Sequence, residues 1–254
     1  MKLQRPELLP DPALSRDEME ELQRKVASEA VFDDCLPTDP GEVEEGDAVI
    51  AGVDQSFRRK EERKEEAVSA VVATRRGEVT ERVHASAETR TEYIPGLLSF
   101  REGEAVVEAL KKLSVTPDIL LFDGSGRIHF RQAGIATHIG VVFDVPSVGV
   151  AKNLLCGRVV TRDGEDWDAT SLDEGSRLGV VADSSVEAPD GTVIGYAYQS
   201  RQFESSNRHV NPLYVSPGHR VTAETAVDLV ESTCEGYKLP EPTRIADSYA
   251  DTVK

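Results

Sequence analysis

The feature that most constrains the fold is Asp118–Asp123, in which four apolar residues, "ILLF", lead into an aspartate. An apolar run without polar alternation is typical of a strand covered on both faces, so this segment is expected at the centre of a sheet. The segment Ala48–Asp54, "AVIAGVD", has the same form. A buried carboxylate is costly unless it is paired or bound to a cation, so two of them on central strands demand a partner.

Asp54 and Asp123 would repel each other if their strands were neighbours, and a divalent cation would remove that repulsion. Glu102 is a third candidate, because it opens a predicted helix over 102–113 that must pack on the same sheet. Oxygen ligands from three separate elements suit Mg²⁺ or Mn²⁺. The pattern alone leaves open, with equal weight, the simpler interpretation that both aspartates are turn or cap residues.

The rest of the chain predicts an α/β fold, a mixed sheet flanked by helices, because a strand meander is followed by alternating helices and strands. We expect one domain over 1–254, in which 1–47 form an arm, a helix and an acidic linker ahead of a core over 48–254. Residues 162–175 are expected to form a loop or hairpin. The other expected helices are one over 15–30, begun by a Ser15–Glu18 capping box, one over 131–143, and one capped by Thr222. The other expected strands are two joined near Arg76–Gly77 and those over 146–152 and 192–201.

The charge is strongly negative, with 29 basic and 46 acidic residues and a net charge of −17. Only nine of the basic residues are lysine. Such a surface suits a very salty cytoplasm, where the Debye length falls to roughly 3 Å at 1 M salt; the alternative is simply an acidic soluble protein. We expect folding and activity that tolerate or require high salt.

The location and assembly state are expected from what the sequence lacks. No run of 18 apolar residues and no signal-peptide core occur, so a cytoplasmic protein without a membrane partner is expected. The three cysteines are far apart, which predicts free thiols. A monomer is expected.

Several long blocks occur in an order that resembles the endonuclease V family. They are "YIPGLLSFRE" (93–102), "FDGSGRIHFRQAGIATHIG" (122–140), "PSVGVAKNLLCG" (146–157) and "PLYVSPGHRVTAETAVDLV" (212–230). The resemblance covers residues 15–250 and implies a ribonuclease H-like fold. It also implies a metal-dependent nuclease that recognises deoxyinosine in DNA and cuts the second phosphodiester bond 3′ to it, leaving a 3′-hydroxyl and a 5′-phosphate in DNA repair.

The resemblance assigns roles to individual residues. The metal-binding carboxylates would be Asp54, Glu102 and Asp123, with Mg²⁺ as the cofactor and Mn²⁺ as a substitute. His219 would be the catalytic histidine, and Lys152 would help to hold the phosphate. The wedge that opens the duplex would be Tyr93, Ile94 and Pro95. The pocket for the flipped base would be lined by Gly96, Leu98, Gly126, His129, Ile135 and Leu155.

Simpler interpretations stand beside these roles. Tyr93 could anchor a loop on the core, Lys152 could be a solvated strand-end lysine, and His219 could mark the start of a helix. The chain also departs from the family pattern at Ser125, where many relatives carry His, and in "HFRQ" (129–132), where "HPRR" is common. A nuclease that acts on inosine in RNA or on nucleic-acid structure, and a binding module with weak cleavage, are the alternative functions.

Overall fold

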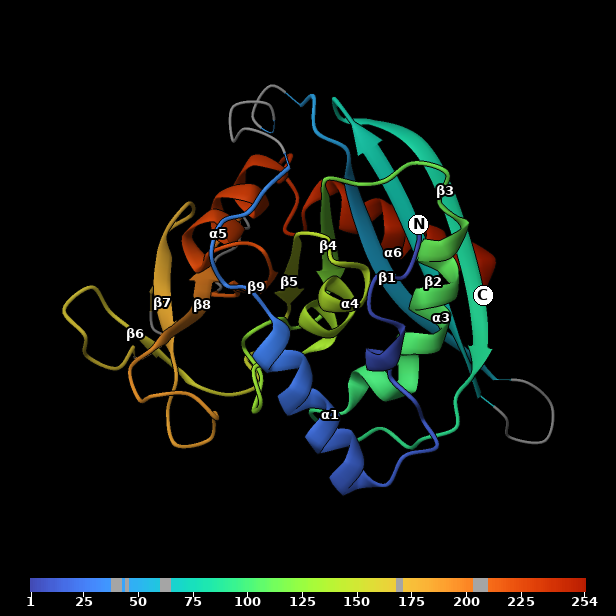
Figure 1. Cartoon of the computed structure of the whole chain (residues 1–254). Coiled ribbons are helices and arrows are strands. Elements are labelled where there is room, and N and C mark those ends of the chain that lie inside the picture. Colours follow the sequence, from blue (N-terminus) through green and yellow to red (C-terminus); the bar gives the residue numbers. More distant parts are fainter. Residues whose placement is uncertain (38–42, 44–45, 60–64, 168–170, 203–209) are drawn as a thin grey trace.

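The computed structural model describes the whole chain except residues 38–42, 44–45, 60–64, 168–170 and 203–209 (Figure 1). Its centre is a mixed sheet of nine strands in the order β3-β2-β1-β4-β5-β9-β8-β7-β6. The strands are β1 (Ile50–Arg59), β2 (Glu65–Arg75), β3 (Glu78–Glu88), β4 (Ile119–Asp123), β5 (Ser147–Ala151), β6 (Arg158–Val160), β7 (Arg177–Val181), β8 (Val193–Tyr198) and β9 (Leu213–His219). The helices are η1 (Pro6–Leu8), α1 (Arg16–Glu29), α3 (Leu98–Lys112), α4 (Ile135–Phe143), α5 (Ala223–Ser232) and α6 (Glu241–Val253).

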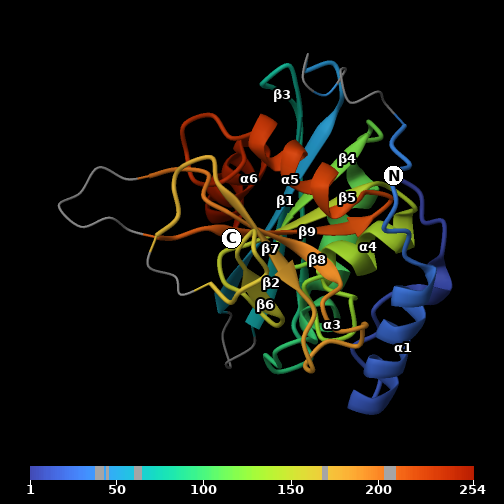
Figure 2. The same ribbon diagram turned by 90° about the vertical axis from the view of Figure 1, so that its left-hand side faces the viewer.

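The sheet separates two layers of helices. Helices α3 and α4 cover one face, with α1 packed outside α4, while α5 and α6 cover the other face (Figures 1 and 2). Strands β1, β4 and β5 run parallel, and every other pairing is antiparallel. The predicted mixed sheet flanked by helices is therefore confirmed.

Strand β4 shows why the central strands read as continuous apolar runs. Leu120 and Phe122 join the core under α3 and α4. Ile119 and Leu121 join the core under α5 on the other face. All four are fully buried, so the prediction of a central strand covered on both faces is confirmed.

Two elements near the C-terminus were not predicted, and proline is the reason in both. Strand β9 contains Pro217, but a register irregularity between Ser147 and Val148 of the neighbouring β5 lets the strand accommodate a residue without an N–H. Helix α6 follows Pro240 and carries Pro242 in its first turn. The missing N–H is harmless there, because the first N–H groups of a helix have no partner within it.

The N-terminal arm is closely docked rather than irregular. The ammonium group of Met1 donates to the carbonyl oxygens of Leu110 and Leu113, each at 3.1 Å, and Leu8 is 1% exposed. The capping box between Ser15 and Glu18 is present at the start of α1, as predicted. Residues 38–42 and 44–45 of the predicted acidic linker lie outside the described residues.

The three cysteines, Cys35, Cys156 and Cys234, are free thiols, as predicted. In the part of the chain that the structure describes, none of the helices has both the length and the apolar character needed to span a bilayer.

Candidate active site

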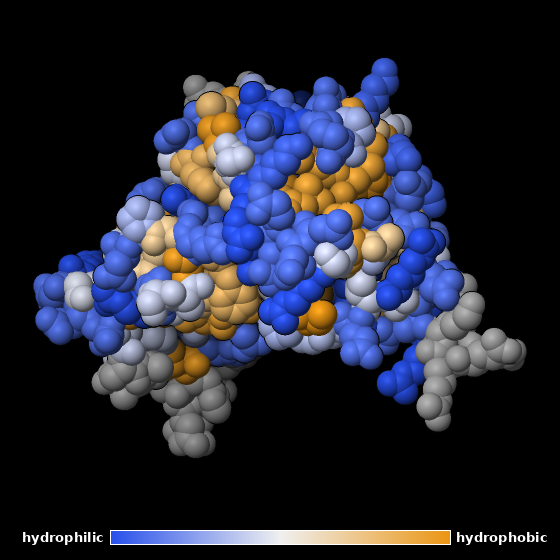
Figure 3. All heavy atoms as spheres, turned by 60° about the horizontal axis from the view of Figure 1, so that its bottom comes forward, coloured by the Kyte–Doolittle hydropathy of each residue, from blue (hydrophilic) through white to orange (hydrophobic). Residues whose placement is uncertain are grey.

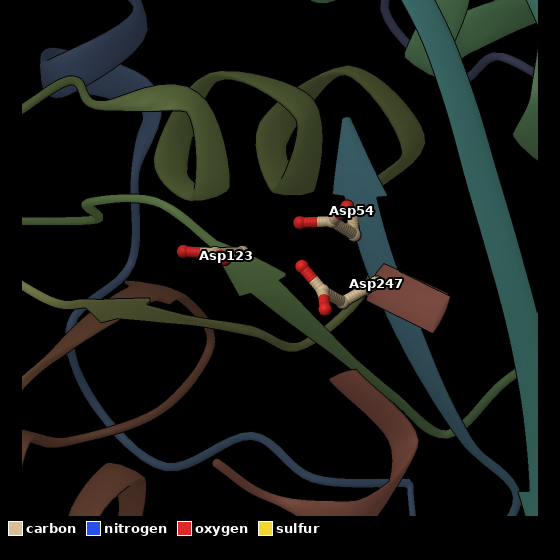
Figure 4. Close-up of side chains that lie close together, drawn as sticks. All are labelled: Asp54, Asp123 and Asp247. Atoms are coloured by element: carbon tan, nitrogen blue, oxygen red, sulfur yellow. The ribbon is translucent and has the colours of Figure 1, made fainter. Parts of the chain in front are cut away.

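Three aspartates meet where the parallel pairing of β1 with β4 ends. Val53 of β1 lies opposite Phe122 of β4 in parallel register, so Asp54 and Asp123 follow side by side. Both point to the face covered by α6, and α6 adds Asp247 (Figure 4). One carboxylate oxygen from each residue lies within 4.8 Å of the others. Asp54 is buried, Asp123 is half-buried and Asp247 is exposed, so the group is open to solvent on one side.

Gly52 explains how α6 comes close enough to contribute. A Cβ atom at Gly52 would lie 2.1 Å from the carbonyl oxygen of Pro242, so any side chain there would push the helix away. Asp247 lies little more than one turn beyond Pro242 along α6. The close approach at Gly52 therefore places the Asp247 carboxylate beside Asp54.

The electrostatics of this group favour a bound cation. Burial raises the pKa of Asp54 to about 8, and the negative charges of Asp123 and Asp247 add to the shift. Burial likewise raises the pKa of Glu102 to about 8, opposed by Arg101 and assisted by the charge of Asp123. Glu102 comes from α3 and lies close enough to Asp123 to sense its charge, but outside the group of three. A divalent cation bound to these oxygens would favour the ionised carboxylates and so oppose the effects of burial and repulsion that raise both pKa values.

Lys152 is the cation that faces this group. It follows β5 directly, and its Nζ donates to Oδ2 of Asp123 at 2.7 Å. The pKa of Lys152 is raised on balance: burial lowers it, and the carboxylates of Asp123, Asp247 and Asp54 outweigh that effect. Its side chain is 46% exposed, so the ammonium group remains accessible to a substrate phosphate.

A cavity of about 540 Å³ opens beside Asp123 and Lys152. It lies between the loop that precedes α3 and the loop that precedes α4. Small-molecule sites commonly span roughly 300–1,000 Å³. Figure 3 views the molecule from the end to which β1, β4 and β5 lead, where hydrophobic patches alternate with a hydrophilic surface. The predicted residues that line the cavity are Tyr93, Pro95, Gly96, Leu98, His129, Ile135 and Leu155.

Two residues expected at the wedge or pocket lie behind its walls. Ile94 packs against the buried cluster of Met19, Leu97 and Phe100, so it anchors the loop whose Tyr93 is 64% exposed. Gly126 is packed so closely that a Cβ atom there would lie 2.4 Å from the carbonyl oxygen of Pro217. Both residues shape the cavity without lining it.

His129 fixes the backbone of the pocket. It is buried, and its burial lowers its pKa to about 4, so the imidazole is neutral at physiological pH. Its Nδ1 accepts the Arg131 N–H at 3.2 Å, which leaves the proton on Nε2 to be donated to the Gly96 carbonyl at 2.9 Å. Gly96 has a φ of +83°, a conformation that favours glycine. The role of His129 is therefore to hold the Gly96 turn.

The structure places His219 at the opposite end of the sheet. His219 ends β9 and lies opposite Ser147, the first residue of β5. At the other end of β5, Asp123 lies opposite Val150 and Lys152 follows Ala151. Its Nδ1 accepts the Val31 N–H at 3.1 Å and its Nε2 donates to Asp144 at 3.0 Å. The ring is fully buried, and burial lowers its pKa against the opposing pull of Asp144. His219 is not brought together with the carboxylates.

Comparison with known proteins identifies the family. The family model described as "Endonuclease V" matches residues 37–248. The chain belongs to the endonuclease V family. An endonuclease V from the halophilic archaeon Haloarcula marismortui is 54% identical over 98% of this chain and 96% of its own length. Human ENDOV is 29% identical, with a TM-score of 0.73 over 94% of this chain and 98% of that one.

Another endonuclease V, from Ciona intestinalis, was solved with a 24-mer DNA containing an inosine followed by a ribo-adenosine. It is 22% identical, with a TM-score of 0.71, and the match covers 93% of this chain and 96% of that one. This chain is thus a nuclease of the endonuclease V family, and its fold is the fold of the family.

The site of this endonuclease V includes residues that sequence reasoning missed. Asp247 is the main one, and the two prolines ahead of it hid the helix that carries it. Gln23 of α1 also lines the cavity, although α1 lies outside the predicted core. Its signal was a lone polar residue on the apolar face of α1, between buried Met19 and Val26.

The two departures from the family pattern have clear positions. Ser125 lines the cavity. Gln132, with a φ of +52°, accepts from Arg127 Nε at 2.9 Å and donates to the Glu187 carbonyl at 2.7 Å. Gln132 therefore links two loops beside the pocket.

Proposed function

We propose that this endonuclease V is a metal-dependent nuclease that recognises deoxyinosine in DNA. It hydrolyses the second phosphodiester bond 3′ to the lesion, leaves a 3′-hydroxyl and a 5′-phosphate, and acts in DNA repair. The observation that carries the proposal is the open group of Asp54, Asp123 and Asp247 directly beside a base-sized cavity. A cleavage centre and a recognition pocket thus share one side of the molecule.

The donor set fits Mg²⁺, with Mn²⁺ as a substitute, because every candidate ligand is a carboxylate oxygen. Asp54, Asp123 and Asp247 would hold the ion, and Glu102 would approach from α3. When bound, the ion supplies charge stabilisation on the phosphate and a water of lowered pKa.

The protein's own cation completes the phosphate site. Lys152 would exchange its contact with Asp123 for a non-bridging phosphate oxygen once the carboxylates hold a metal. As a compact point charge on a flexible stem, its ammonium group can follow the phosphate during the reaction. We assign no catalytic role to His219, because both of its ring nitrogens are engaged at the other end of the sheet.

Recognition of the base would rest on the wedge loop and the pocket. Tyr93, exposed at the rim, would replace the stacking that a flipped base loses, while Ile94 holds the loop on the core. Flipping costs a few kcal/mol and least for a weakly paired base, which favours a deaminated base over a normal one. The inosine-containing DNA bound to the Ciona protein of the same fold supports this substrate.

Four end-labelled oligonucleotides in molar KCl with Mg²⁺ test the proposal. They are duplex DNA with one deoxyinosine, its undamaged control, single-stranded DNA with deoxyinosine, and single-stranded RNA with inosine. We expect one cut, one nucleotide past the lesion, that is absent from the control and in EDTA. Preference for the RNA would move the substrate to inosine-containing RNA, and binding without cleavage, with Mn²⁺ also tried, would contradict the nuclease mechanism.

A further inference from the structure

Gln23 is a buried polar side chain that joins the two walls of the cavity. It lies in the middle of α1 and is 1% exposed, yet it lines the cavity. Its Nε2 donates to the Gly96 carbonyl at 2.8 Å and to the Ala133 carbonyl at 3.4 Å. Gly96 belongs to the wedge loop before α3, and Ala133 belongs to the loop that leads into α4. One amide group thus spans the pocket from wall to wall.

The acceptor of the same side chain is also used. Oε1 of Gln23 accepts from Arg131 Nε at 2.8 Å. The guanidinium of Arg131 lies 3.6 Å from Glu20, one turn earlier on α1. Both amide hydrogens and the amide oxygen of Gln23 are therefore engaged within the protein, so Gln23 positions the walls rather than contacting a base itself.

The Gly96 carbonyl receives two of these bonds. His129 donates to it at 2.9 Å, and Gln23 donates to it at 2.8 Å. His129 is fixed in turn by the Arg131 N–H. Two donors from different elements fix the position of this carbonyl more tightly than either donor alone. The carbonyl belongs to the loop that carries Tyr93, so the two bonds also position that loop.

Helix α1 is also attached to the loop between β7 and β8, outside the pocket. Arg24 makes a bidentate ion pair with Glu187 at 3.0 Å, and Gln132 donates to the Glu187 carbonyl. The match to the family model begins only at residue 37, so α1 lies outside it. The N-terminal helix is nevertheless a wall of the site in this chain.

We propose that Gln23 is a positioning residue that sets the separation of the pocket walls and thereby the affinity for the flipped base. The inference rests on the proposed function, since the flipped base is the ligand of this pocket. The three aspartates come from β1, β4 and α6, so their arrangement does not depend on Gln23. Loss of Gln23 should therefore weaken lesion recognition and spare the chemical step.

The test compares three variants in single-turnover cleavage of the deoxyinosine duplex over a range of enzyme concentrations. Gln23→Met keeps the length of the side chain and loses every hydrogen bond. Gln23→Glu keeps the acceptor for Arg131 and loses the donor to Gly96 and Ala133. Lys25→Met, on the exposed side of the same helix, is the matched control.

We expect the half-saturating concentration to rise about 30-fold in Gln23→Glu, which loses two hydrogen bonds, and about 150-fold in Gln23→Met, which loses three, since each lost hydrogen bond is worth about 1 kcal/mol. The maximal rate should stay within about 2-fold, and Lys25→Met should match the wild type. An unchanged half-saturating concentration in Gln23→Met, or a Gln23→Glu variant that behaves like the wild type, would overturn the proposal that Gln23 sets the separation of the pocket walls.

Hydrogen exchange separates this inference from the proposed function. Amide exchange over 94–98 and 133–136 should quicken in Gln23→Met, while exchange in β1 and β4 stays unchanged. A wild-type enzyme that does not distinguish deoxyinosine from adenine would contradict the proposed function. Unchanged exchange in both wall segments would overturn the role of Gln23 whatever the substrate is.

Discussion

The charged and titratable side chains at the two ends of β4 and β5 differ in how well they are paired. At the end where β4 and β5 finish, the carboxylates of Asp54, Asp123 and Asp247 lie close together, and Lys152 donates to Asp123. At the end where β5 begins, His219 is neutral and has a partner for each ring nitrogen. One end has an excess of like charge, and the other is internally satisfied.

The difference indicates which end carries out chemistry. Like charges are tolerated in a partly buried group when a ligand compensates them, whereas a satisfied hydrogen-bond network needs nothing further. The proposed active site therefore includes Asp247, which the sequence analysis did not predict, and leaves out His219, which it did. The following experiments challenge this contrast, beginning with the largest expected effect.

Removing a carboxylate at the charged end should abolish cleavage. Asp54→Asn should lower the rate by at least about 100-fold, because even groups outside the ligand shell of a metal commonly contribute 10- to 100-fold. The unfolding temperature in EDTA at pH 8 should not fall, because Asn buries no charge and is not repelled by Asp123 and Asp247. A variant that cuts at the wild-type rate, or that unfolds much more easily, would remove Asp54 from the metal site.

Removing the cation at the same end should have a smaller effect. Lys152→Met should slow cleavage roughly 10- to 100-fold, since a hydrogen bond to a charged group is worth about 1.5–3 kcal/mol. Lys152→Arg should recover part of the rate because the charge is kept. The control is Lys254→Met, a change at the exposed chain end. If Lys152→Met cleaves like this control, Lys152 is a solvated lysine and not a phosphate ligand.

The stability of the metal-free protein should depend on pH through the charged end. Asp54 and Glu102 have folded-state pKa values of about 8, above ordinary values of 3.8 and 4.5. The folded state therefore keeps protons that the unfolded state has lost, and stability should fall as pH rises from about 4 to 8. Scanning calorimetry in EDTA should show that the unfolding temperature falls with pH, and this dependence should be weaker in Asp54→Asn. Without EDTA, Mg²⁺ should stabilise the folded protein more at pH 8 than at pH 6. A flat wild-type profile would contradict the raised pKa values.

A substitution at the His219 end of the sheet should lower the stability of the protein. His219→Ala leaves the Val31 N–H and the Asp144 carboxylate without this partner, which should lower the free energy of unfolding by about 1–3 kcal/mol. Urea denaturation measures the loss. An unfolding free energy equal to that of the wild type would show that the His219 contacts contribute nothing to stability.

The contrast also shows what sequence can and cannot reveal. The apolar runs that end in Asp54 and Asp123 predicted two central strands, because burial on two faces leaves a local pattern. Asp247 left no such pattern, since its position depends on how closely α6 approaches Gly52. The position of His219 could not be predicted either, because the direction of β9 decides which end of the sheet His219 reaches, and that direction depends on the topology. Gln23 needed the docking of α1 before its hydrogen bonds could be seen.

The most direct test compares Mg²⁺-dependent cleavage of the deoxyinosine duplex by Asp247→Asn and His219→Gln, with Asp251→Asn on the same helix as the control. We predict that Asp247→Asn loses most of its activity at every Mg²⁺ concentration. Folded His219→Gln and Asp251→Asn should keep cleavage rates within about 2-fold of the wild type, because the His219 ring lies at the other end of the sheet from the carboxylates. Full activity in Asp247→Asn together with an inactive but folded His219→Gln would contradict the assignment of chemistry to the carboxylate end.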